Sequence, residues 1–271
     1  MPIARSDAVF AGSIPELYET RMVPAIFAPY APALAAWVAA AGPSRVLELA
    51  AGTGAATRAL AEALPAHVAL VATDLHPPML DRARAIGVGR AIDWRQADAH
   101  HLPFDDGSFD AVACQFGVMF FPDRVGAYRE VHRVLVPGGS FVFSTWDTLA
   151  HNTFAEAVNQ AVTSLFPEDP PRFFERTPHG YADQAAIRAD LAAAGFGEPR
   201  IEALTRTSRA ATPLDVALAF CQGTPLRAEI EARAAGSLGP VTVSVADAVA
   251  RRFGDGPIEG TMRAHLVSAT R

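Results

Sequence analysis

The stretch RVLELAAGTGAATRAL (residues 45–60) runs from an apolar strand pattern through glycines into an alanine-rich helix pattern. Gly52 and Gly54 let the backbone approach a ligand closely, and the first turn of the following helix presents unpaired N–H groups. A strand, a glycine turn and a helix in this order predict a site for an anion or a nucleotide. Glycine loops that bind dinucleotides carry a third glycine where this chain has Thr57.

Strand and helix patterns alternate through this part of the chain at the spacing of a parallel sheet covered on both faces. The strand patterns are RVLELA, HVALVATDL, AIDWRQADA, SFDAVACQF and SFVFSTW. Between them, PPMLDRARAIG begins with prolines that suit a first helical turn, and RVGAYREVHRVL is expected to end at PGG. We therefore expect an α/β fold with a doubly wound, mostly parallel sheet.

The rest of the chain adds helices and completes the sheet. Residues 13–41 predict two helical segments broken by Pro24, Pro29 and Pro32, while EPRIEALTRTS and IEGTMRAHLVSAT predict a sixth and a seventh strand. We expect four parts: an N-terminal helical lid segment over 1–41, a ligand-binding core over 42–147, a substrate-side insert over 148–180, and completion of the sheet over 181–271 with a helical insert near 213–253.

The composition is that of an ordinary globular protein. With 271 residues, 50% of them hydrophobic, the chain can bury a large core without disulfides or metal ions. Cys114 and Cys221 show no metal-ligand spacing and fit small buried side chains in a reducing compartment. A net charge of -6 argues against a nucleic-acid partner, and the sequence has neither an apolar run of 18 residues nor a signal-peptide core. We expect a cytoplasmic protein without a metal site or a membrane span.

An acidic residue ends the second strand pattern. Asp74, in VATDL, lies 20 residues beyond Gly54. At that distance a carboxylate can accept hydrogen bonds from both hydroxyls of a ribose. The alternative is that Asp74 only caps the helix that starts in HPPML. Together with the glycine turn, Asp74 favours a ligand that contains a nucleoside.

Four motifs in order resemble the class I S-adenosylmethionine-dependent methyltransferases, in the branch similar to the ubiquinone/menaquinone-biosynthesis methyltransferases. They are VLELAAGTG, DLHPPMLDRAR, QADAHHLPFDDGSFDAVACQFGVMFFPD and EVHRVLVPGGSFVFSTW, of which LPFDDGSFDAV is the most specific. One departure is Ala50, where the family usually has its first glycine; alanine is small enough for the turn. The resemblance implies a Rossmann-like methyltransferase fold that binds S-adenosylmethionine and releases S-adenosylhomocysteine.

The resemblance also implies a role for each matched position. The methionyl part of the cofactor would lie against Glu48, Ala50, Gly52, Thr53 and Gly54. The nucleoside would be held by Asp74 on the ribose, by Leu75 and Met79 on the adenine ring, and by Asp98 and Ala99 on its amino group. Gln115 and Phe116 would line the reacting end. All of these positions fall at the carboxyl ends of the expected parallel strands, where such sheets bind their ligands.

Methyl transfer does not impose a fixed catalytic residue, because the cofactor carries its own leaving group. His151 and His179 are candidate bases because they fall in the 148–180 insert, whereas His100 and His101 are expected to face solvent. Tyr18 either shields the sulfonium by a cation–π contact or packs in the core.

The resemblance predicts transfer of a methyl group to oxygen, carbon or nitrogen of a small, largely apolar metabolite. The clusters MFF (119–121) and RFF (172–174) either line the acceptor pocket or belong to the core. Two other functions stay open: a protein that binds S-adenosylmethionine for regulation or non-methylating chemistry, and an NAD(P)-dependent oxidoreductase. The sequence leaves the oligomeric state open.

Overall fold

A computed structural model describes residues 14–234 and 237–271, in two compact units. The sheet unit comprises Tyr30–Trp146, Tyr181–Leu204 and Ala264–Arg271. Among the described residues, the helical unit comprises 14–29, Asp147–Gly180, 205–234 and 237–263. The first 13 residues of the expected lid segment lie outside the described residues.

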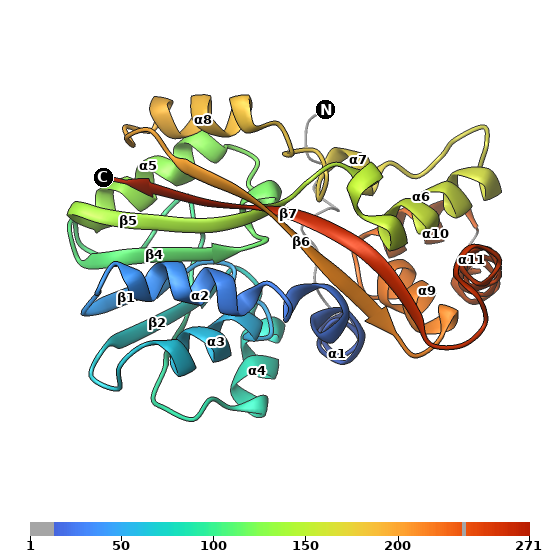
Figure 1. Ribbon diagram of the computed structural model, residues 1–271, viewed down its shortest axis with the longest axis horizontal. Coiled ribbons are helices and arrows are strands. Elements are labelled where there is room, and N and C mark those ends of the chain that lie inside the picture. The colour runs from blue at the N-terminus through green and yellow to red at the C-terminus, as the bar shows by residue number, and fades with distance from the viewer. Residues whose placement is uncertain (1–13, 235–236) are drawn as a thin grey trace. The chain divides into compact units, whose positions relative to one another are not determined.

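A seven-stranded sheet runs in the order β3-β2-β1-β4-β5-β7-β6 (Figure 1). Its strands are β1 (Arg45–Glu48), β2 (Ala69–Asp74), β3 (Asp93–Gln96), β4 (Phe109–Gln115), β5 (Leu135–Trp146), β6 (Arg200–Ala210) and β7 (Ile258–Thr270). The first five strands pair in parallel, whereas β7 is antiparallel to β5. The predicted α/β class and mostly parallel, doubly wound sheet are confirmed. The strand order reverses at β1, and ligands of open α/β sheets bind beyond the carboxyl ends of the strands at such a point.

Helices cover both faces of the sheet within the sheet unit. They are α2 (Ala31–Ala40), α3 (Ala55–Ala63), α4 (Pro77–Ile86), α5 (Arg124–Val134), α8 (Gln184–Ala193) and the short 3-10 helix η3 (Val118–Phe120). Successive side chains of β5 point to opposite faces. Val142 belongs to the core cluster beneath α2 and α3, while Phe141 and Phe143 pack on Tyr128 of α5. The two faces are therefore built from different side chains, aliphatic on one side and aromatic on the other.

The helical unit is built from short helices. They are α1 (Ile14–Leu17), the π-helix η2 (Tyr18–Phe27), the 3-10 helix η4 (Leu149–His151), α6 (Thr153–Leu165), α7 (Phe173–Arg176), α9 (Pro213–Gln222), α10 (Leu226–Arg233) and α11 (Leu238–Phe253). Helix α11 packs against both α6 and α9. An ion pair of Arg21 with Asp215 (2.5 Å) joins η2 to α9. These helices come from three separate stretches of the chain, so long-range packing holds the unit together.

The expectation that PGG ends the helix before β5 is wrong. Helix α5 ends at Val134 and β5 begins at the next residue, so PGG lies inside the strand. The pairing of β4 with β5 shifts there, from Phe109 opposite Leu135 to Ala111 opposite Ser140. A bulge takes up the additional residues, and Gly138 provides its left-handed backbone with a φ of 80°.

The expectation that Pro24 breaks a helix is also wrong. Pro24 lies inside η2, where the wider π turn is closed by bonds such as Ala28 N to Val23 O (2.8 Å). Pro32, in contrast, takes one of the first positions of α2, where its missing N–H has no helical partner to lose.

None of the helices in residues 14–234 and 237–271 is by itself long and apolar enough to cross a membrane. Only the bent pair Ile14–Phe27 and Ala31–Ala40 reaches that length and apolarity together.

Candidate functional site

The turn between β1 and α3 is held in left-handed backbone conformations. Ala50, Gly52 and Gly54 have φ angles of 52°, 57° and 87°. Glycine adopts this conformation without strain, whereas an L-residue loses roughly 1–2 kcal/mol. Ala50 is therefore strained at the position where the resemblance expects a glycine. A Cβ on Gly54 would lie only 3.3 Å from the Trp94 ring, so a side chain at this position would crowd that ring.

Asp74 ends β2 and lies against this turn. Its Oδ2 accepts a hydrogen bond from Gly52 N (2.8 Å), and its Oδ1 accepts one from His76 N (2.8 Å). His76, and not Asp74, is the N-cap of α4, so Asp74 is more than a helix cap. Oδ2 keeps a second lone pair for a ligand hydroxyl, whereas Oδ1 also faces His76 Nδ1 at 3.3 Å. The turn and a buried acceptor pair thus meet where β1 and β2 end.

Glu48, the last residue of β1, is buried beside Asp74. Burial raises the pKa of Glu48 to about 8, and the Asp74 charge adds to this rise, whereas a hydrogen bond from the main chain of Thr57 opposes it. Among the described residues, Glu48 Oε2 and Thr53 Oγ1 have no hydrogen-bond partner. A buried polar atom without a partner costs about 1–3 kcal/mol. The site therefore favours a ligand with polar groups that reach these two atoms.

Asp98 and Ala99 lie in the loop after β3. Oδ1 of Asp98 accepts a hydrogen bond from His100 N (2.9 Å) and lies 2.8 Å from His100 Nδ1. Burial raises the pKa of Asp98, but the hydrogen bonds from His100 more than offset this and lower the pKa below its ordinary value. The side chain of His101 is 87% exposed, whereas that of His100 is only 19% exposed. The expectation of a solvent-facing side chain is therefore wrong for His100, because Asp98 holds its ring.

The two residues expected to flank an adenine ring differ in exposure. Leu75, in the loop after β2, is 47% exposed, while Met79 is buried in the first turns of α4. A large exposed apolar side chain directly after Asp74 offers a surface on which a flat ring can pack.

Aromatic side chains meet where β4 and β5 end. Phe116, directly after Gln115, has a left-handed φ of 53° and stacks on Trp146 at 3.8 Å between ring centroids. Tyr30 packs edge-on against both rings, at 5.4 and 5.5 Å. The sequence analysis missed Tyr30 and Trp146. Trp146 could have been found because it ends the fifth strand pattern; Tyr30 gave no such signal.

Three expected residues lie in the helical unit. Tyr18 stacks on Phe27 (4.9 Å), and His151 Nδ1 lies 3.1 Å from Thr148 Oγ1. Burial lowers the pKa of His179 to about 4, and its Nδ1 lies 2.7 Å from the Asp147 carbonyl oxygen. An imidazole with so low a pKa is a weak base at neutral pH. The roles of Tyr18, His151 and His179 stay predictions.

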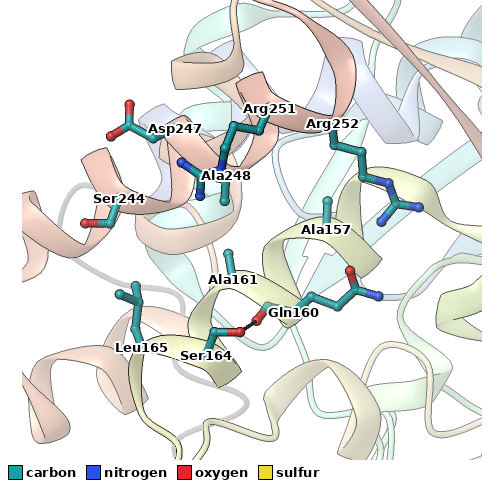
Figure 2. A pocket seen from close by; sticks show the side chains of 10 residues that line it. All are labelled: Ala157, Gln160, Ala161, Ser164, Leu165, Ser244, Asp247, Ala248, Arg251 and Arg252. Atoms are coloured by element: carbon teal, nitrogen blue, oxygen red, sulfur yellow. Dashed lines mark hydrogen bonds between the residues drawn. The ribbon is translucent and has the colours of Figure 1, made fainter.

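An open groove of about 560 Å³ lies between α6 and α11 of the helical unit (Figure 2). Arg251, Arg252 and Asp247 line it from α11, and Gln160 lines it from α6. Arg252 pairs with Glu156 (2.6 Å), so the positive and negative charges of the groove nearly balance. Its lining is too polar for the apolar acceptor pocket expected from the sequence.

Gly117 packs directly against the strained Ala50. A Cβ on Gly117 would lie 2.5 Å from Ala50 Cβ and 2.7 Å from Cys114 Sγ. We therefore expect Gly117→Ala to lower the free energy of unfolding by about 1–3 kcal/mol in urea denaturation. In the double variant, Ala50→Gly removes one of the two close contacts and should restore part of this loss. Gly89→Ala is the control because the described residues leave open space around Gly89; an equal loss there would contradict the packing argument.

Glu48 should make the stability of the ligand-free protein fall as the pH rises. The ordinary pKa of 4.5 applies to the unfolded chain and a pKa of about 8 to the folded one. The stability that neutral Glu48 contributes is thus complete below its unfolded pKa and is lost as the pH rises through the folded pKa. Glu48→Gln cannot ionise. Between about pH 5 and about pH 8.5, we therefore expect the free energy of unfolding of the variant to increase relative to that of the wild type, by an amount on the order of a few kcal/mol.

Urea unfolding of both proteins at several pH values within that window measures this difference. A stability difference that stays constant with pH would show that Glu48 does not remain neutral in the folded protein.

The chain matches the family model of a methyltransferase domain over residues 47–143. It is 35% identical over 174 residues to a demethylmenaquinone methyltransferase of Thermus thermophilus, a match that covers 60% of this chain and 78% of that protein. It is 31% identical over 151 residues to the ubiquinone/menaquinone biosynthesis C-methyltransferase UbiE of a Geobacter species, covering 54% of this chain and 64% of that protein. The solved structure of the YcgJ protein of Bacillus subtilis has a TM-score of 0.57 at 18% identity and covers 89% of this chain and 98% of its own.

At that low identity the structural likeness shows the fold alone, which is the Rossmann-like fold of methyltransferases. The sequence matches go further, because the matched segment 47–143 contains the turn after β1 and the strand ends that carry Asp74, Asp98 and Phe116. The chain belongs to the class I S-adenosylmethionine-dependent methyltransferases, in the branch similar to the ubiquinone/menaquinone-biosynthesis enzymes.

Proposed function

We propose that the chain transfers a methyl group from S-adenosylmethionine to a small, largely apolar acceptor and releases S-adenosylhomocysteine. The observation that carries this proposal is the Asp74 carboxylate held against the left-handed turn, 2.8 Å from Gly52 N. The two buried carboxylate oxygens can accept hydrogen bonds from ribose hydroxyls, and the adjoining glycine turn leaves room for an amino acid joined to that ribose. When bound, S-adenosylmethionine supplies a methyl group already activated on a sulfonium.

The residues of the sheet unit fit this cofactor from one end to the other. In the proposal, Asp74 accepts hydrogen bonds from the ribose hydroxyls, and the turn of Ala50, Gly52 and Gly54 lies along the methionyl part. Glu48 Oε2 and Thr53 Oγ1, both buried without a partner among the described residues, meet its polar groups. The adenine end would be held by Leu75, Met79, Asp98 and Ala99, and the reacting end by Gln115 and Phe116.

The protein's part in the chemistry is to align the acceptor and to exclude water. Alignment alone can lower a barrier by roughly 7–11 kcal/mol in favourable cases. A general base is needed only for an acceptor that is still protonated and weakly acidic. We keep His151 and His179 as candidates for that role, and Tyr18 as a candidate shield of the sulfonium. With a pKa of about 4, His179 would be a weak base at neutral pH.

For the acceptor we propose a flat, electron-rich ring of the quinol type, methylated on carbon, ahead of oxygen or nitrogen acceptors. The stacked rings of Phe116 and Trp146, with Tyr30 against their edges, offer an apolar and planar wall at the ends of β4 and β5. The relatives named above are, by their names, a demethylmenaquinone methyltransferase and a C-methyltransferase of ubiquinone/menaquinone biosynthesis.

Asp74→Ala should weaken the binding of S-adenosylhomocysteine at least about tenfold, because each charge-assisted hydrogen bond contributes roughly 1.5–3 kcal/mol. Calorimetry with S-adenosylhomocysteine and with NAD⁺ and NADP⁺ measures this affinity and the choice of cofactor. Asp81→Ala, which changes an exposed acid of α4, is the matched control. Unchanged affinity in Asp74→Ala would contradict the ribose assignment, and tight binding of a dinucleotide instead would contradict the cofactor.

Transfer of a labelled methyl group then tests the acceptor. We expect the purified enzyme to label a demethylated naphthoquinol faster than a simple phenol or an aliphatic amine of similar size. Mass spectrometry of the product identifies the methylated atom. Preferred labelling of the amine would overturn the quinol-type acceptor and leave the cofactor assignment untouched.

A further inference from the structure

We propose that His100 is a positioning residue that, as an imidazolium, holds the Asp98 carboxylate ready for the amino group of the adenine ring. The inference rests on the proposed function, because it takes the cofactor as the ligand of Asp98. It adds to that function a residue which sets the selectivity for adenine.

Both ring nitrogens of His100 face oxygen atoms that accept hydrogen bonds. Nδ1 lies 2.8 Å from Asp98 Oδ1, and Nε2 lies 3.1 Å from the carbonyl oxygen of Asp123. A carbonyl oxygen and an ionised carboxylate cannot donate, so each nitrogen must carry a proton to make its hydrogen bond. A neutral imidazole carries only one N–H proton. In one of the two contacts, the lone pair of the unprotonated nitrogen would then face a lone pair of the oxygen, which is repulsive. The imidazolium satisfies both.

His100 occupies only one oxygen of the carboxylate. Oδ1 of Asp98 accepts from both the main-chain N and Nδ1 of His100. Oδ2 lies 4.0 Å from His101 Nδ1, which is beyond hydrogen-bonding distance, and the Asp98 side chain is half-exposed. The same hydrogen bonds lower the pKa of Asp98 against the effect of burial, so the carboxylate stays ionised. Oδ2 is thereby presented to the ligand as a charged acceptor.

The ring of His100 is itself fixed by the start of α5. Asp123 is the N-cap of that helix, and its Oδ1 accepts from Gly126 N (2.9 Å) while its carbonyl oxygen faces His100. Phe121 packs edge-on against the imidazole at 5.8 Å. The charged and titratable groups that face His100 are thus Asp98 and His101 in its own loop and Asp123 at the helix start.

One consequence follows from this arrangement. A carboxylate that can only accept favours the amino group of adenine and repels the carbonyl oxygen that inosine carries at the same position. Without the His100 ring to hold Asp98, cofactor affinity should fall and the preference for adenine should shrink.

Three variants separate this role from a structural one. His100→Ala removes both side-chain hydrogen bonds, whereas His100→Asn places an amide N–H near the former Nδ1 and cannot reach Asp123. His101→Gln alters the exposed neighbour and is the matched control. We expect S-adenosylhomocysteine to bind about tenfold more weakly to His100→Ala than to the wild type.

His100→Asn should bind with intermediate affinity, because its amide can replace one of the two side-chain hydrogen bonds. The preference for S-adenosylhomocysteine over S-inosylhomocysteine should fall in His100→Ala and stay unchanged in His101→Gln. A loss of stability alone would not move this preference.

The outcomes distinguish this inference from the proposed function. If the wild type binds no S-adenosylhomocysteine at any pH, the proposed function fails. If the wild type binds it and His100→Ala binds it equally tightly, only the role of His100 is overturned. A loss of affinity in His101→Gln as large as that in His100→Ala would also overturn it.

Discussion

The hydrogen bond from Gly52 N to Asp74 Oδ2 joins the end of β2 to the turn after β1, and the rest of the site depends on it. The left-handed conformations of Ala50 and Gly52 accompany this bond, and one of them strains an alanine. Asp74 in turn adds to the burial that keeps Glu48 protonated near neutral pH. This hydrogen bond thus holds the turn next to the Asp74 carboxylate, and that charge in turn helps to keep Glu48 neutral.

The sequence was sufficient for features that follow from strand ends and spacing. Asp74 was proposed as a ligand residue because a residue at the carboxyl end of a parallel strand lies at the ligand edge of the sheet, whereas the role of Asp98 was implied by the resemblance to methyltransferases. The approach of Tyr30 to Phe116 and Trp146 was not predictable, since it depends on how the N-terminal helices pack. PGG and Pro24 were interpreted as helix ends on local propensity alone. In the structure, a bulge in the pairing of β4 with β5 accommodates PGG, and a π turn accommodates Pro24.

His100 and His101 show the same limit at a finer scale. In the sequence they are adjacent histidines, two and three residues from Asp98, and nothing local shows which of them contacts that carboxylate. The difference between them comes from Asp123, which the fold brings to within 3.1 Å of His100 from 23 residues away. No local pattern contains that contact. A residue that acts through a second residue is therefore the kind of functional group that sequence patterns find least easily.

The chemistry of methyl transfer explains why so few charges are fixed near the proposed site. The cofactor carries its own leaving group, so an ionised base is not required for the reaction itself. Glu48 is kept neutral by burial, and the wall at the ends of β4 and β5 is made of stacked rings. Asp74 and Asp98 would bind the cofactor, and the other groups named here are uncharged. An apolar acceptor can therefore bind without removing water from a charged side chain. A charged acceptor would have to lose its water against aromatic rings, and this cost favours the flat, uncharged ring proposed as the substrate.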